Sequence, residues 1–87
     1  MLTNVMENVA RRALQNLIER GYDGCTCERC QNDILAIALN HLPPQYSASP
    51  AGEVYIKAKM LEDQAAVDVM QELARAMEIV REHKRHA

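Results

Sequence analysis

All three cysteines of the chain fall within six residues, in the spacing Cys25-x-Cys27-x-x-Cys30. Thiolates separated by one and two residues converge when the backbone turns sharply, and Gly24 makes such a turn easier. Zinc prefers thiolates in tetrahedral geometry, so the cluster predicts a structural zinc site with three of its four ligands from cysteine. An odd number of cysteines in so short a segment is a poor disulfide framework.

The identity of the fourth ligand is not determined by the sequence, because several groups could supply it. His41 follows the second predicted helix and would reach the cluster only if that helix folds back. His83 and His86 could arrive from the C-terminal helix of the same or another subunit, and water would leave an open site.

Two other interpretations of the cluster remain beside zinc. The cysteines could be partly buried thiols without an ion, or a redox-reactive pair. A redox C-x-x-C motif normally lies at a helix N-terminus in a βαβ setting, which this sequence does not predict. We find no H-E-x-x-H array for hydrolytic zinc chemistry and no nucleotide-binding glycine loop, so we expect no enzyme.

The composition favours a small all-α domain. The chain has 87 residues and contains neither Phe nor Trp, so Leu, Ile, Val, Met and Ala must form the core, a palette typical of helices. We expect one domain spanning residues 1–87. Chains of this size bury only about 60% of their unfolded surface and need a metal, disulfides or a partner subunit.

The apolar spacing predicts a first helix over residues 4–20. Thr3 or Asn4 suits its N-cap, and Gly21 suits the position after its end, where φ is positive. A second helix is expected to open at Asn32 or Asp33 and to stop around residues 40–41, because a proline follows at position 43.

The last third of the chain, residues 53–84, can be one helix of about 45 Å. It follows a loop over residues 41–52, in which Ser49-Pro50 resembles a helix start. Alternatively Glu53–Lys59 forms a separate short element, since Val54-Tyr55-Ile56 has strand-like propensity. The apolar stripe of the long helix exceeds what two short helices can cover, so we expect a homodimer. That stripe comprises Ala66, Met70, Leu73, Met77 and Val80.

The charge pattern restricts the partners. A formal net charge of -2 with interspersed signs argues against direct DNA binding and against binding to anionic membranes. No apolar run approaches the roughly 20 residues that span a bilayer, and the N-terminus lacks the pattern of a signal peptide. We therefore expect a cytoplasmic protein.

The run from Cys25 to Tyr46 resembles the late competence development protein ComFB family, above all in D-I-x-A-x-A-L-N-x-L-P-P-x-Y over residues 33–46. Residues 4–7 and 55–59 fit the same pattern. The resemblance implies a small, helical, homodimeric and non-enzymatic regulatory protein with cysteine-bound zinc. Some members sit in competence operons, and others are described as receptors for cyclic di-GMP. The chain departs from a full zinc set in having no fourth cysteine.

A receptor for a cyclic dinucleotide needs cations or helix N-termini for the phosphates, flat groups that stack on guanine, and polar groups for the base edges. Because the ligand is two-fold symmetric, each subunit of a dimer could supply one half-site. The candidate ligand-binding residues are Asn40, Tyr46, Tyr55, Lys57, Lys59 and Arg75. The alternative function is a structural adaptor of the competence apparatus that binds an unknown protein partner and no nucleotide.

Overall fold

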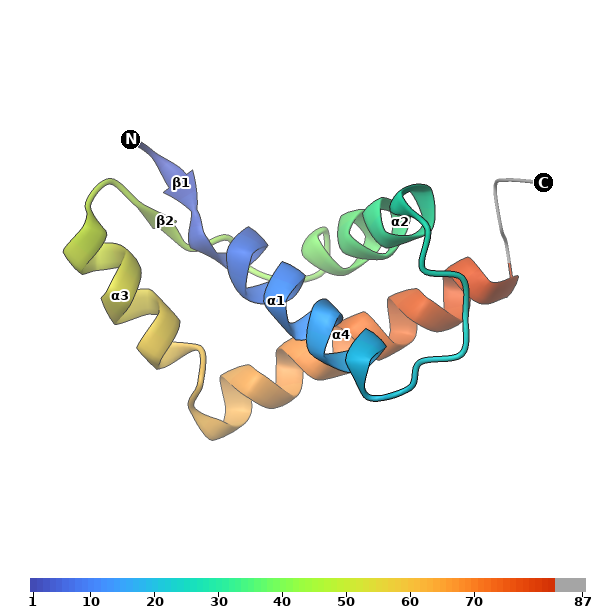
Figure 1. Ribbon diagram of the computed structural model, residues 1–87. Coiled ribbons are helices and arrows are strands. Elements are labelled where there is room, and N and C mark those ends of the chain that lie inside the picture. Colours follow the sequence, from blue (N-terminus) through green and yellow to red (C-terminus); the bar gives the residue numbers. More distant parts are fainter. Residues whose placement is uncertain (83–87) are drawn as a thin grey trace.

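The computed structural model describes residues 1–82, which form a mostly helical molecule (Figure 1). In chain order the elements are β1 (Thr3–Asn4), α1 (Val5–Glu19), α2 (Glu28–Leu39), β2 (Tyr46–Ser47), α3 (Pro50–Lys59) and α4 (Asp63–Glu82). The strands pair antiparallel over two residues each. The helical class is therefore as predicted, whereas a single domain over residues 1–87 stays a prediction.

Of the two predicted N-cap residues of α1, Thr3 and Asn4, the structure selects Asn4 and adds a long-range contact to it. Asn4 Oδ1 accepts a hydrogen bond from the Met6 amide at 3.2 Å, as an N-cap does. The same oxygen accepts the Gln45 amide at 2.8 Å, and the Val5 amide donates to the Gln45 carbonyl at 2.6 Å. One side chain thus caps the helix and fixes the segment that leads into β2.

The end of α1 also follows the prediction. Gly21 has a φ of 107° and is the residue after the C-cap. Its amide donates to the carbonyl of Ile18, and the Tyr22 amide donates to the carbonyl of Leu17. These two bonds make up a Schellman motif, which turns the chain out of the helix and into the cysteine loop.

The start of α2 differs from the prediction. Instead of opening at Asn32 or Asp33, the helix begins at Glu28, and Cys27 is its N-cap. The Cys27 sulfur accepts a hydrogen bond from the Cys30 amide at 3.4 Å, so a thiol caps the first turn. The cysteines therefore belong partly to the helix and not to a loop alone.

The end of α2 and the start of α3 were predicted from local signals and are confirmed. The last helical residue of α2 is Leu39 and Asn40 is its C-cap, ahead of the proline at position 43. In α3, Ser49 is the N-cap and accepts the Gly52 amide at 3.1 Å, with Pro50 in the first helical position.

The alternative of a separate short element over Glu53–Lys59 is confirmed, but the strand-like propensity of residues 54–56 was misleading, because they lie inside the helix α3. The cap that precedes them sets helical geometry from the first turn. An ion pair between Glu53 and Lys57, at 3.8 Å and one turn apart, adds to the preference for a helix.

Residues 53–84 do not form one helix. The chain bends at residues 60–62, where Met60 is buried in the core and Leu61 is exposed. α4 has 20 residues, or about 30 Å. Within residues 1–82, no helix has both the length and the apolar character needed to cross a membrane.

The core lies where α4 packs along α2 and crosses α1, while α3 lies on the other side of α1 (Figure 1). Leu73, Met77 and Val80 of the predicted stripe are buried, and Val69 is buried in place of Met70. Helices of the same chain cover most of this stripe. The stripe alone therefore does not require a second copy, and the homodimer stays a prediction.

Replacing Gly21 by alanine should destabilise the protein by about 1–2 kcal/mol, because an L-residue is strained at positive φ. The cost is purely conformational, since an added Cβ at this position meets no atom within 4 Å. Urea unfolding measures it. Gly21→Asn is the matched control and should lose less, because asparagine tolerates this conformation; equal losses for both variants would contradict the assignment.

Candidate metal centre

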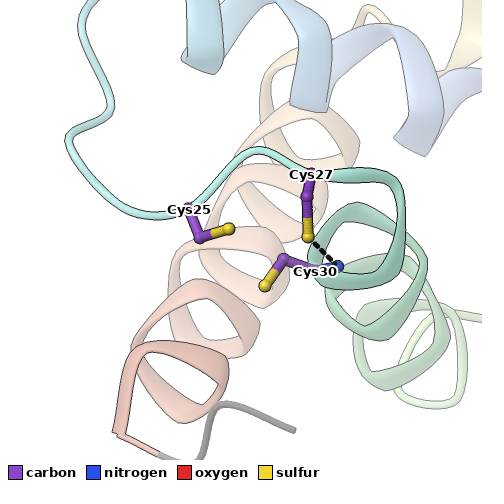
Figure 2. Close-up of side chains that lie close together, drawn as sticks. All are labelled: Cys25, Cys27 and Cys30. Carbon is purple, nitrogen blue, oxygen red and sulfur yellow. Dashed lines mark hydrogen bonds between the residues drawn. The ribbon is translucent and has the colours of Figure 1, made fainter. Parts of the chain in front are cut away.

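Three thiols converge where the loop after α1 enters α2 (Figure 2). Cys25 comes from the loop, Cys27 precedes α2 directly and Cys30 lies in its first turn. Their sulfur atoms all lie within 4.8 Å of one another. Cys30 is buried, Cys25 is half-buried and Cys27 is exposed. The structure therefore brings together the three residues that the spacing selected.

The donor set fits a soft or borderline cation such as zinc and does not fit magnesium or calcium, which prefer oxygen. With Zn–S bonds of about 2.3 Å, tetrahedral ligands lie about 3.8 Å apart. The sulfur–sulfur distances are at most 4.8 Å. Small side-chain rotations would shorten them to about 3.8 Å. Cys25, Cys27 and Cys30 would then supply three of the four ligands.

Burial raises the pKa of the Cys30 thiol to about 12, and hydrogen bonding with Cys25 and Cys27 adds to the rise. In the absence of a cation the fold therefore keeps Cys30 protonated at neutral pH. A metal ion binds the thiolate and must displace this proton, so metal binding at the cluster is coupled to proton release.

The cysteine loop is fastened to the end of α4 by an interaction that sequence reasoning missed. Arg81 Nη2 donates to Asp23 Oδ1 at 2.7 Å, and the Arg81 guanidinium lies 5.4 Å from the centre of the Tyr22 ring. Gly24 permits this arrangement, because a Cβ there would overlap the Tyr22 ring. The partners are 58 residues apart, and no local pattern indicates such a pair.

A second polar contact joins the loop to both neighbouring helices. Gln31 Nε2 donates to the carbonyl of Thr26 at 2.6 Å, and Gln31 Oε1 accepts from Gln15 Nε2 at 2.9 Å. The loop that carries Cys25 is therefore tied to α1, α2 and α4.

The predicted fourth ligand, His41, is not brought to the cluster within this chain. α2 runs without interruption from Glu28 to Leu39, so it separates the two sites by about 18 Å along its axis. His41 Nδ1 instead lies 2.9 Å from the carbonyl of Ile37. The other two histidine candidates, at positions 83 and 86, lie outside the described residues.

The six predicted ligand-binding residues are distributed over four elements. Asn40 is exposed at the end of α2, Tyr46 is in β2, and Arg75 is exposed on α4. The other three lie on α3: Tyr55, Lys57 and Lys59. Figure 1 places β2 and α3 at the opposite end of the molecule from the start of α2. Tyr46, Tyr55, Lys57 and Lys59 are therefore separate from the metal centre.

No single cavity among the described residues is lined by all six predicted ligand-binding residues. Lys57 lines a groove of about 550 Å³ between α1, α3 and α4, whose apolar lining includes Val9, Met60 and Val69. Lys59 borders a different, open depression beside the start of α4. A site built from several of the six would need a further surface, such as that of a second subunit.

Comparison with known proteins gives consistent results over nearly the whole chain. The family model described as "Late competence development protein ComFB" matches residues 3–84. The "Competence protein ComFB" of Bacillus subtilis (strain 168) is 33% identical over 82 residues, which cover 94% of this chain and 84% of that protein. A solved structure of the late competence protein ComFB from Bacillus subtilis superposes with a TM-score of 0.83 at 32% identity, covering 97% of this chain and 94% of the other.

Cys27→Ser should abolish stoichiometric zinc binding and lower the melting temperature by about 10 °C or more, since 1 kcal/mol corresponds to roughly 4–8 °C at this size. Serine is itself a good N-cap, so the helix start survives the substitution. Metal analysis and thermal unfolding under reducing conditions measure both effects. In excess chelator the variant and the parent protein should melt together; unchanged metal content in the variant would refute the ligand assignment.

The raised pKa of Cys30 predicts how the metal-free protein responds to alkali. The unfolded chain loses the Cys30 proton near pH 9, whereas the folded chain keeps it up to about pH 12. The stabilisation is therefore complete below pH 9 and is lost as the pH rises toward 12. The urea midpoint of the metal-free protein should fall over this range.

The matched control for this pH dependence is Cys30→Ala, which lacks the titrating group. Its urea midpoint should decline less steeply above pH 9 than that of the parent protein, because the difference in Cys30 proton binding between the folded and unfolded chains is then absent. Parallel declines in the two proteins would show that the pKa of Cys30 is not raised in the fold.

Proposed function

The chain belongs to the late competence development protein ComFB family, and on that basis we propose that it is a cytoplasmic regulatory protein that binds cyclic di-GMP as a homodimer and catalyses no reaction. Zinc at Cys25, Cys27 and Cys30 has a structural role in this proposal. It holds the loop and α2 in place at the end of the molecule remote from α3.

The observation that carries the nucleotide proposal is the exposure of two tyrosines on neighbouring elements. The chain has three tyrosines and no other large aromatic residue. Tyr46 in β2 is 59% exposed and Tyr55 in α3 is 69% exposed, and β2 packs against α3. Aromatic rings are normally a major part of a core. Two that face solvent on neighbouring elements offer flat surfaces on which a purine base can stack.

A cation lies next to one of these rings. Lys59 follows Tyr55 by one helical turn, so the two side chains share a face of α3 and could contact base and phosphate together. Lys57 is a weaker candidate, because it already pairs with Glu53. A second copy of the same face would complete a two-fold symmetric site for a two-fold symmetric ligand.

The adaptor function is the second candidate, and exposed apolar side chains favour it. Val54 is 67% exposed and Leu61 is 81% exposed, and Leu61 also borders the groove between α1, α3 and α4. Apolar residues around a groove are typical of protein docking sites. In this case α3 would meet a downstream protein partner directly and no nucleotide would be needed.

Titration calorimetry of the zinc-loaded protein with cyclic di-GMP distinguishes the two functions. We expect heat of binding, with half a ligand or one ligand per subunit, and a dimer in light scattering. Tyr55→Ala should weaken binding by about 1–3 kcal/mol, which is the value of one base stack. Tyr55→Phe keeps the aromatic ring and is the matched control. Titration with cyclic di-AMP tests whether the site discriminates guanine from adenine.

The absence of heat and of a thermal shift at high ligand concentration would refute the receptor and leave the adaptor. If the affinity for cyclic di-GMP is unchanged in both Tyr55→Ala and Tyr46→Ala, the binding site does not lie on α3. A monomer with bound ligand would exclude the symmetric arrangement.

A further inference from the structure

We propose that Cys27 is a modification site for low-molecular-weight disulfides, and that Cys30 resolves the adduct into a Cys27–Cys30 disulfide that dismantles the metal centre. The loss of metal rests on the zinc role proposed above, whereas the thiol chemistry rests on the cluster alone. The supporting geometry is three sulfur atoms within 4.8 Å of one another, of which one faces solvent.

Cys27 is the sulfur that a solute can reach. It is exposed, whereas Cys30 beside it is only 1% exposed. It is also the N-cap of α2 and accepts the Cys30 amide. Exposure thus selects Cys27 as the sulfur that a solute attacks first.

Cys30 is placed to complete the reaction. It lies three residues after Cys27 in the first turn of α2, and its sulfur need move only from within 4.8 Å to the disulfide length of about 2.05 Å. Cys25 is similarly near, but a disulfide between Cys25 and Cys27 would span one intervening residue and close a more strained ring.

This arrangement revises the sequence argument against redox chemistry. A reactive C-x-x-C pair was not expected because the sequence does not predict a helix N-terminus in a βαβ setting at the cysteines. The helix α2 begins between them, so Cys27-Glu28-Arg29-Cys30 has the helix N-terminal position of a redox motif without a βαβ unit.

The reaction balances as two thiol–disulfide exchanges. The Cys27 thiolate attacks one sulfur of a disulfide RSSR, the S–S bond breaks, and RS⁻ leaves. The Cys30 thiol then passes its proton to the released RS⁻ and attacks the Cys27 sulfur of the mixed disulfide, and a second RS⁻ leaves. The chain gives up two electrons, RSSR is reduced to one thiol and one thiolate, and only Cys25 remains as a sulfur ligand.

Zinc-loaded full-length protein treated with oxidised glutathione tests the proposal. We expect zinc to appear in a chromogenic chelator at one ion per Cys27–Cys30 disulfide, as mapped by differential alkylation and peptide mass spectrometry. Dithiothreitol and added zinc should restore the starting protein.

Two variants separate the roles of the two cysteines, and both are compared with the metal-free parent protein. Cys30→Ser lacks the resolving thiol and should accumulate glutathione on Cys27. Cys27→Ser should form mixed disulfide at least ~10-fold more slowly, because the remaining thiols are half-buried or buried.

The modification site is refuted if the metal-free parent protein does not react with oxidised glutathione. It is also refuted if the adduct or disulfide forms without Cys27. A Cys27–Cys30 disulfide that leaves zinc bound would overturn the loss of metal. If the protein takes up no zinc at all, the proposed structural role of zinc fails, and the disulfide formed in the metal-free chain still decides the modification site.

Discussion

The sulfur cap on α2 is the contact on which the arrangement of the molecule depends. Because Cys27 accepts the Cys30 amide, the helix begins early enough to carry Cys30 into the core. Cys30 then packs with the buried residues of α1 and α4 while its sulfur stays next to that of Cys25. One local interaction thus sets the start of a helix, fills a position in the core and assembles a set of metal ligands.

Features encoded by adjacent residues were predictable from the sequence. Asn4 and Ser49 cap their helices through side chains that reach amides two or three residues away, and Gly21 ends α1 through its own backbone freedom. The convergence of the three cysteines also follows from their short spacing. In each case the physical cause lies within one turn of the chain, where capping and turn rules apply.

Features that depend on distant residues were not predictable in the same way. The hydrogen bond between Asn4 and Gln45 joins positions 41 apart, and the pair formed by Asp23 and Arg81 joins the cysteine loop to the last helix. The helical state of residues 54–56 opposes their intrinsic preference, because the preceding cap and the ion pair along α3 outweigh it. The early start of α2 was missed since cysteine is not among the usual capping residues.

The absence of fully buried side chains from α3 has a consequence for its dynamics. Ten residues are too few to hold a helix in water without tertiary support, and α3 obtains this support mainly from half-buried contacts to α1 and β2. Its detachment therefore exposes little apolar surface and costs far less than global unfolding. Amide hydrogens of α3 should exchange ahead of those of α2 and α4, and any molecule that binds the intact helix will slow that exchange.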